Sequence, residues 1–158
     1  MSGLFKFAAD DDLSMLDVSK WDVHNVTTFR YMFYGCKNIK NLDLSKWDVR
    51  NGINFEFMFA GCSDFNSDLS GWNVSNAKNL SAMFYECESI NFDLSNWNVN
   101  NCTNFDNMFK YANYDGIKFD WTITNVDTYN NLMESKFFRT YFDRANPANT
   151  INVKFKKD

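Results

Sequence analysis

Residues 43–51 read Asp-Leu-Ser-Lys-Trp-Asp-Val-Arg-Asn, and this stretch sets the organisation of the whole chain of 158 residues. Close copies occupy residues 17–25, 68–76 and 93–101, and a degenerate copy remains at residues 121–125. The tryptophans of the five copies, at positions 21, 47, 72, 97 and 121, are separated by 26, 25, 25 and 24 residues. Such a period predicts structural units that stack, since one unit cannot bury its apolar face alone.

The first half of each repeat predicts a short β-strand. Its pattern is L-x-x-W-x-V-x-N, in which Trp and Val lie two residues apart and therefore face the same side of a strand. In the second copy these residues are Leu44, Trp47, Val49 and Asn51. So short a strand is not stable by itself, so we expect neighbouring copies to pair in parallel and in register. The recurring Asn is expected to cap the following helix or to bond the backbone of the adjacent repeat.

The second half of each repeat has the apolar spacing of a helix. In the first copy its residues are separated by 3, 3, 1 and 3 positions: Val26, Phe29, Met32, Phe33 and Cys36. This spacing places them on one helix face. A helix of about two to three turns is marginal alone, so we expect it to depend on packing. We attribute the longer first interval to one extra residue near Gly52.

Together the two halves predict an α/β repeat solenoid. Its parallel sheet has one short strand per repeat, its other face carries short helices, and each end is capped. We assign residues 1–16 to an N-terminal cap built as half a repeat, residues 17–134 to five tandem repeats, and residues 135–158 to a C-terminal cap.

The two predicted caps rest on different patterns. The N-terminal cap aligns with the repeats when Phe7 takes the place of Phe33. In the C-terminal cap Ile151, Val153 and Phe155 alternate with polar residues, which predicts a final half-buried strand at the edge of the sheet.

The repeat also resembles known families. The core L-x-x-W-x-V-x-N is similar to the L-x-x-L-x-L-x-x-N core of leucine-rich repeats. The longer string D-L-S-x-W-x-V-x-N-x-x-x-F-x-x-M-F-x-G-C resembles a surface-protein repeat of about 25 residues found in mycoplasmas and lactobacilli, a BspA-like leucine-rich-repeat relative. The resemblance covers residues 17–134. It implies a leucine-rich-repeat-like solenoid with a binding role, often at the cell surface.

The sequence offers no pattern typical of catalysis, so we expect a protein that is not an enzyme and has no cofactor and no metal. His24 is the only histidine, which excludes a pair of His metal ligands. There is no Gly-rich phosphate loop. No Cys-x-x-Cys spacing indicates zinc or redox chemistry, and we interpret the cysteines as reduced core residues.

Charge and hydropathy limit the partners and the location. The net charge is -4, and acids and bases divide evenly between the two halves, so no basic stripe indicates direct binding of nucleic acid. The N-terminus lacks the apolar segment of a signal peptide, and no apolar run approaches the ~20 residues of a membrane helix. We expect a monomer in the cytoplasm without a membrane partner. The alternative is the cell surface, if the chain belongs to a longer exported protein.

Two surfaces are candidates for binding a partner. If Trp and Val face the core, the residues around them form an exposed sheet face, which solenoids use for recognition. This predicted face consists of Lys20, Asp22, His24, Lys46, Asp48, Arg50, Asn73, Ser75, Asn98 and Asn100. The second candidate is a set of aromatic residues in the second halves of the repeats: Tyr31, Tyr34, Phe57 and Tyr85. The alternatives are a merely solvated face and aromatics that pack against neighbouring helices.

We therefore expect a non-enzymatic module that binds another protein. In its narrower form it is a small intracellular inhibitor or adaptor that occludes its partner, encoded by a phage or virus against a host defence enzyme. A basic nucleic-acid-handling enzyme would suit the acidic charge of the chain. The alternative, implied by the family resemblance, is a bacterial surface adhesin or structural repeat protein.

Overall fold

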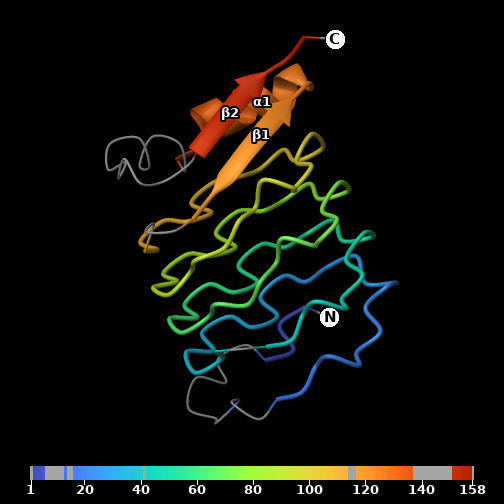
Figure 1. Ribbon diagram of the computed structural model, residues 1–158, viewed down its shortest axis with the longest axis vertical. Helices are drawn as coiled ribbons and strands as arrows, with labels where there is room; N and C mark the ends of the chain where they lie inside the picture. The colour runs from blue at the N-terminus through green and yellow to red at the C-terminus, as the bar shows by residue number, and fades with distance from the viewer. Residues whose placement is uncertain are drawn as a thin grey trace.

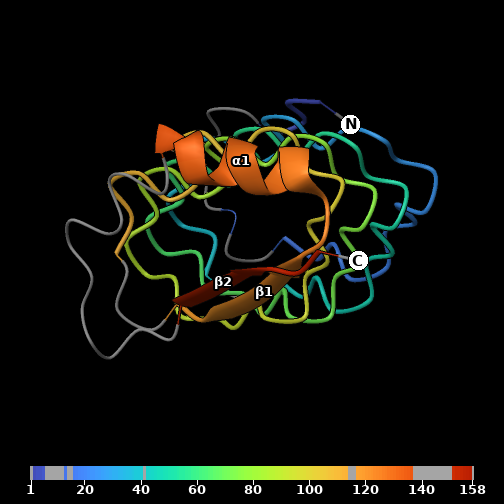
Figure 2. The same cartoon turned by 90° about the horizontal axis from the view of Figure 1, so that it is seen from above.

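The computed structural model describes residues 2–5, 13, 16–40, 42–113, 117–136 and 151–157. The chain winds into a column of stacked coils (Figure 1). The N-terminus lies towards one end of the column, and the other end carries three elements: β1 (Phe119–Ile123), α1 (Val126–Glu134) and β2 (Ile151–Phe155). Seen along the column, α1 lies over one side and the two strands over the opposite side (Figure 2). We number the coils by their first residues: Asp17, Asp43, Asp68 and Asp93.

Backbone hydrogen bonds join each coil to the next. The N–H groups of Phe29, Tyr31, Phe33 and Gly35 in the first coil donate to carbonyls of the second coil at 2.8 to 3.0 Å. Equivalent bonds run from the second coil to the third and from the third to the fourth, for example from Phe84 to Met108 at 2.9 Å. We call this set of bonds the turn ladder. It leaves no coil independent of its neighbours.

The turn ladder is built from turns, which corrects the helices expected in the first four repeats. Within the first coil, the N–H of Met32 donates to the carbonyl of Phe29 and that of Cys36 to the carbonyl of Phe33. A left-handed backbone recurs at two positions of every coil: Tyr31 and Gly35, Phe57 and Gly61, Ala82 and Glu86, Asn107 and Tyr111. A positive φ interrupts a helix, whereas it fits the third position of a type II turn. Turns of this kind repeat the apolar spacing of a helix, so the sequence pattern fits both.

The strands expected around the first four tryptophans are also corrected. Among the described residues the only strands are β1 and β2, and the segments around the first four tryptophans combine turns with irregular backbone. The N–H of Trp47 is used locally, by the carbonyl of Leu44. Instead, indole N–H groups donate to carbonyls of the preceding coil at 2.9 to 3.2 Å: Trp47, Trp72, Trp97 and Trp121. On the tryptophan side of the column, side-chain hydrogen bonds therefore join neighbouring coils, whereas backbone hydrogen bonds join them in the turn ladder.

Both ends of the column can be compared with the sequence. The strand predicted from Ile151 to Phe155 is confirmed as β2, which pairs in parallel with β1. At the other end the register differs, because Phe5 stacks on Phe33 with 5.5 Å between ring centroids. Phe5 therefore takes the place predicted for Phe7, which lies outside the described residues.

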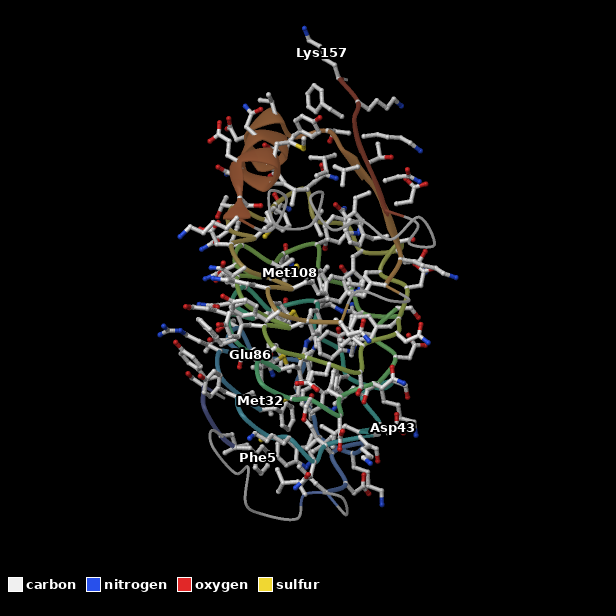
Figure 3. The ribbon with its side chains drawn as sticks, turned by 90° about the vertical axis from the view of Figure 1, so that its left-hand side faces the viewer. Phe5, Met32, Asp43, Glu86, Met108 and Lys157 are labelled. Carbon is white, nitrogen blue, oxygen red and sulfur yellow. The ribbon has the colours of Figure 1, made fainter. Side chains whose placement is uncertain are left out.

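The core consists of columns of equivalent side chains. Phe33, Phe59, Phe84 and Phe109 are fully buried, and their rings stack at 5.2 to 5.9 Å with interplanar angles of 4° to 10°. Each such pair contributes about 0.5–1.5 kcal/mol beyond the burial of its area. Met32 and Met108 mark the run of buried side chains along the column, and the half-buried Phe5 packs against its end (Figure 3).

The recurring Asn has two roles, both expected from the sequence. The amide nitrogens of Asn51, Asn76 and Asn101 donate to backbone carbonyls of the preceding coil at 2.8 to 2.9 Å. Asn125 instead caps α1, where its side chain accepts the N–H of Thr128 at 3.0 Å. The helix predicted for the fifth repeat is thereby confirmed.

Gly52 is not an inserted residue. Its N–H donates to Val49 as that of Val26 donates to Val23, so it is the equivalent of Val26 in the second coil. The extra residue lies later in the first repeat. Cys36 and Asp43 are 7 positions apart, whereas the corresponding Cys and Asp of the next two coils are 6 apart.

Replacing Gly52 by Ala should destabilise the protein. The added Cβ would clash with the Phe55 ring and lie 2.9 Å from the carbonyl oxygen of Val49. We expect the free energy of unfolding, measured by urea denaturation, to fall by about 1–3 kcal/mol. Gly71→Ala is the control, because its Cβ would meet nothing within 4 Å. Equal effects of the two substitutions would contradict this packing.

Replacing Ser67 by Ala should stabilise the protein. The Ser67 hydroxyl is buried without a hydrogen-bond partner, at a position where neighbouring coils carry Leu42 and Phe92. Removing an unsatisfied buried hydroxyl should raise the free energy of unfolding by about 1 kcal/mol. Ser81→Ala should do the opposite, because the Ser81 hydroxyl donates to Asn79 at 2.7 Å. A loss of stability in both variants would contradict the assignment.

Candidate binding surfaces

The polar residues predicted to form a sheet face share one surface, beside the tryptophan segments. We call this surface the polar face, and it comprises Lys20, Asp22, His24, Lys46, Asp48, Arg50, Asn73, Ser75, Asn98 and Asn100. Seven of these side chains are exposed, and Asp48, Ser75 and Asn100 are half-buried. The alternation of buried and exposed residues around Trp and Val is therefore as predicted, although most of these segments are not strands.

A charged cluster occupies the first two coils of the polar face. The carboxylate of Asp48 lies 3.2 Å from Nδ1 of His24 and 2.8 Å from Nε of Arg50. The hydrogen bond from Arg50 is the main cause that lowers the pKa of Asp48. Ion pairs this exposed contribute little to stability. They fix the positions of an imidazole, a carboxylate and a guanidinium that a partner would meet together.

Part of the polar face also holds the coils in shape. Side-chain oxygens in one column accept the N–H two residues later: Asp22, Asp48, Asn73 and Asn98. This is the local turn bond that Asp and Asn form readily. Asn100 is tied further, since its side-chain oxygen accepts the N–H of Thr124 at 2.7 Å. The side chains of the other residues of the polar face do not accept a backbone N–H in this way.

A second row of carboxylates is structural. Asp17, Asp43, Asp68 and Asp93 each accept the N–H of the Ser two residues later. In the first two coils the Ser hydroxyl also donates to the same oxygen, at 2.6 Å. The hydroxyl bond and then the N–H bond lower the pKa of Asp17, Asp43 and Asp93.

The predicted aromatic residues lie together on the turn ladder. Tyr31 stacks on Phe57 with 5.1 Å between centroids, Tyr34 meets Phe57 edge-on at 5.9 Å, and Phe57 lies 6.5 Å from Tyr85. Tyr111, which the sequence reasoning missed, extends the row by an edge-on contact with Tyr85 at 5.5 Å. We call these five residues the aromatic stripe. They pack mainly on one another and are only partly exposed, apart from Tyr111, which is 60% exposed.

Two cations of the chain already contact the aromatic stripe. The Arg30 guanidinium lies 4.7 Å from the centroid of Tyr31 and pairs with Glu56 at 2.7 Å. The Lys110 amine lies 4.9 Å from the centroid of Tyr111. Both distances fall within the range of cation–π attraction. The tyrosine rings of this surface therefore offer electron-rich faces to positive charge.

A hollow of about 540 Å³ adjoins the stripe across three coils. Its lining residues are Tyr34, Gly35, Lys37, Gly61, Ser63, Tyr85, Glu86 and Glu88. Gly61 leaves it open, because an added Cβ would meet only Gly35 within 4 Å. Glu86 lies towards the side of the column away from Asp43 (Figure 3). The sequence signal for this hollow is the column of equivalent residues Gly35, Gly61, Glu86 and Tyr111, in which the side chain disappears in two successive coils.

The cysteines belong to the core. The Cys62 thiol donates to the carbonyl of Phe33 at 3.0 Å, and the Cys87 thiol to that of Phe59 at 3.1 Å. Burial raises the pKa of both thiols, and it raises the pKa of Cys102 to about 12. Within the described ranges, no three His, Cys, Asp or Glu side chains are grouped to hold a metal ion. No helix there is long and apolar enough to cross a membrane.

Comparison with known protein families shows a relationship. A family model described as "Mycoplasma protein of unknown function, DUF285" matches residues 1–121. No curated protein and no solved structure matches the chain. The match spans the column from its first described residues into β1.

Stability should fall in acid because of the Asp–Ser bonds. A carboxyl whose pKa is below its usual 3.8 in the folded state stabilises that state above this pH. Protonation then removes the contribution as the pH falls through the folded-state pKa. We expect the urea concentration at the unfolding midpoint to be lower at pH 2.5 than at pH 6. This difference should be smaller when Ser19 and Ser45 are both replaced by Ala. An equal loss in both proteins would refute this cause.

Proposed function

Since that match covers more than half of the chain, the chain belongs to the DUF285 family of Mycoplasma proteins, and we propose that it is a non-enzymatic protein-binding module. We also propose that the stacked coils form a leucine-rich-repeat-like solenoid, related to the surface repeats of mycoplasmas and lactobacilli and to BspA-like repeats. The turn ladder supports this proposal, since each of the first three coils repeats the same bonds to the next.

The observation that carries the binding proposal is a division between buried and exposed positions. The residues that hold the column together recur from coil to coil, as Trp47 and Trp72 do. The surface positions differ, as in one column of the polar face that holds the exposed His24 and Arg50 and the half-buried Ser75. A rigid surface with position-specific side chains binds without a large cost of ordering.

In its narrower form, the proposal is a small cytoplasmic inhibitor or adaptor that acts as a monomer and occludes its partner. It would be encoded by a phage or virus and directed against a host defence enzyme. A basic nucleic-acid-handling enzyme is the partner that charge favours, because the chain carries a net charge of -4. Complementary charge speeds association and makes it sensitive to salt. The chain itself would not bind nucleic acid.

The second candidate is a surface adhesin or structural repeat protein of a bacterium. Membership in a Mycoplasma family favours it. The two candidates differ in the location of the partner, inside the cell for the inhibitor and outside it for the adhesin.

Binding by the polar face can be tested with a triple variant. Asp48→Asn, Arg50→Glu and Asn73→Asp keep the side-chain oxygens that accept backbone N–H groups at positions 48 and 73, and they change the charge at all three positions. With the wild-type chain as bait in a lysate of its own organism or host, we expect a saturable partner. We expect the triple variant to recover that partner at least tenfold less.

The matched control carries the same charge changes elsewhere: Asp127→Asn, Lys156→Glu and Asn130→Asp, all at exposed positions. It should recover the partner as the wild type does. Equal recovery by the two triple variants would sink binding through the polar face. Failure of any partner to saturate the wild-type bait would sink the binding function itself.

A further inference from the structure

We propose that the hollow beside the aromatic stripe binds the guanidinium of an arginine on a partner protein. The inference deepens the proposed binding function and rests on it. It assigns a second contact surface, on the turn ladder and away from the polar face, and it states the chemistry that this surface recognises.

The shape of the hollow fits a planar group. Tyr34 and Tyr85 come from the first and third coils, and the coil between them contributes Gly61 to the lining. Hydrogen-bonded neighbouring chains lie roughly 4.8 Å apart, so two coils separate the tyrosine backbones by roughly 10 Å. Phe57 of the second coil contacts both rings, at 5.9 Å from Tyr34 and 6.5 Å from Tyr85, so the space for a planar group lies beside this row of rings, over Gly61. Gly61 has a φ of +74°, and its missing side chain keeps this part of the hollow open.

The lining of the hollow carries more negative than positive charge. Glu86 and Glu88 line the hollow, opposed there by the single amine of Lys37. By contrast, two carboxylates of the second coil are held in ion pairs, Glu56 with Arg30 and Asp64 with Lys40. Among the described residues, Glu86 and Glu88 are in no ion pair, so the hollow keeps an excess of negative charge.

The aromatic stripe already holds cations of the chain on its rings. Arg30 over Tyr31 and Lys110 over Tyr111 show that this surface accepts cations on its rings. No cation of the described chain lies over Tyr85, which faces the hollow between these two contacts. Arginine suits the site better than lysine, because its flat guanidinium stacks on rings while several N–H groups remain for carboxylates.

A peptide titration of the full chain tests the proposal. The probe is acetyl-Gly-Arg-Gly-Arg-Gly-amide, and the readout is the NMR shift of the Tyr34 and Tyr85 ring resonances. The control peptide replaces each Arg by citrulline, which keeps the shape and removes the charge. We expect saturable shifts with the Arg peptide and a dissociation constant about tenfold weaker with citrulline. Equal affinity for both peptides, or shifts confined to the polar face, would overturn the proposal.

Charge variants make the test quantitative. Changing Glu86 and Glu88 together to Gln should weaken binding roughly fivefold. Lys37→Gln should strengthen it, which a merely structural effect would not do. The matched control, Asp127→Asn with Glu134→Gln, removes two charges from α1 and should leave the affinity unchanged. Equal weakening by both double variants would mean general electrostatic attraction and no site.

Ring and cavity variants separate stacking from folding. Tyr85→Leu should lose the binding that Tyr85→Phe keeps. Gly61→Asn should block the hollow without melting the column, since Asn tolerates the left-handed backbone of this position. A proline-rich peptide that binds more tightly than the Arg peptide would instead indicate an extended ligand and refute the arginine assignment.

The outcome is independent of the capture experiment. Failure of the Arg peptide to bind overturns the arginine site even where a partner is captured through the polar face. Failure to capture a partner overturns the proposed function even where the peptide binds.

Discussion

The structure depends on hydrogen bonds that run between coils in two directions. In the turn ladder, backbone N–H groups of one coil donate to the next, as from Phe33 to Met58. Side chains donate the other way, since Trp, Asn and Cys reach back to carbonyls of the preceding coil, as Trp72 does to Leu44. Few of these groups would find partners within one coil alone. Buried polar groups left unpaired are costly, so the coils form together or not at all.

Much of this order could be predicted from the sequence, and the reasons for the failures are physical. The period, the buried tryptophans and the roles of the recurring Asn all follow from positions that must be the same in every coil. The turns were mistaken for helices because Phe29, Met32 and Phe33 have a spacing that suits both. The turns differ from helices in the left-handed backbone at residues such as Tyr31 and Ala82. The side chains of these residues do not indicate that conformation.

The two candidate surfaces also differ in how far the sequence predicts them. The polar face could be predicted because it follows from alternation around Trp and Val within a single copy. The aromatic stripe was predicted in part, without Tyr111 and without the hollow beside it. The equivalence of Gly35, Gly61 and Glu86 can be read from the sequence, but the left-handed backbone that places these positions at the hollow cannot. A site that several repeats form together cannot be predicted from the sequence of one repeat alone.

The unequal first repeat has a consequence at the level of the gene. Its extra residue lies between Cys36 and Asp43, and the columns of Trp, Phe and Cys continue through the first two coils without a shift. A difference of one residue in repeat length is therefore accommodated in the segment between coils, and the repeats on either side keep the same register. Recombination between copies can lengthen or shorten the column by complete coils, and each added coil brings a new set of exposed residues for selection to act on.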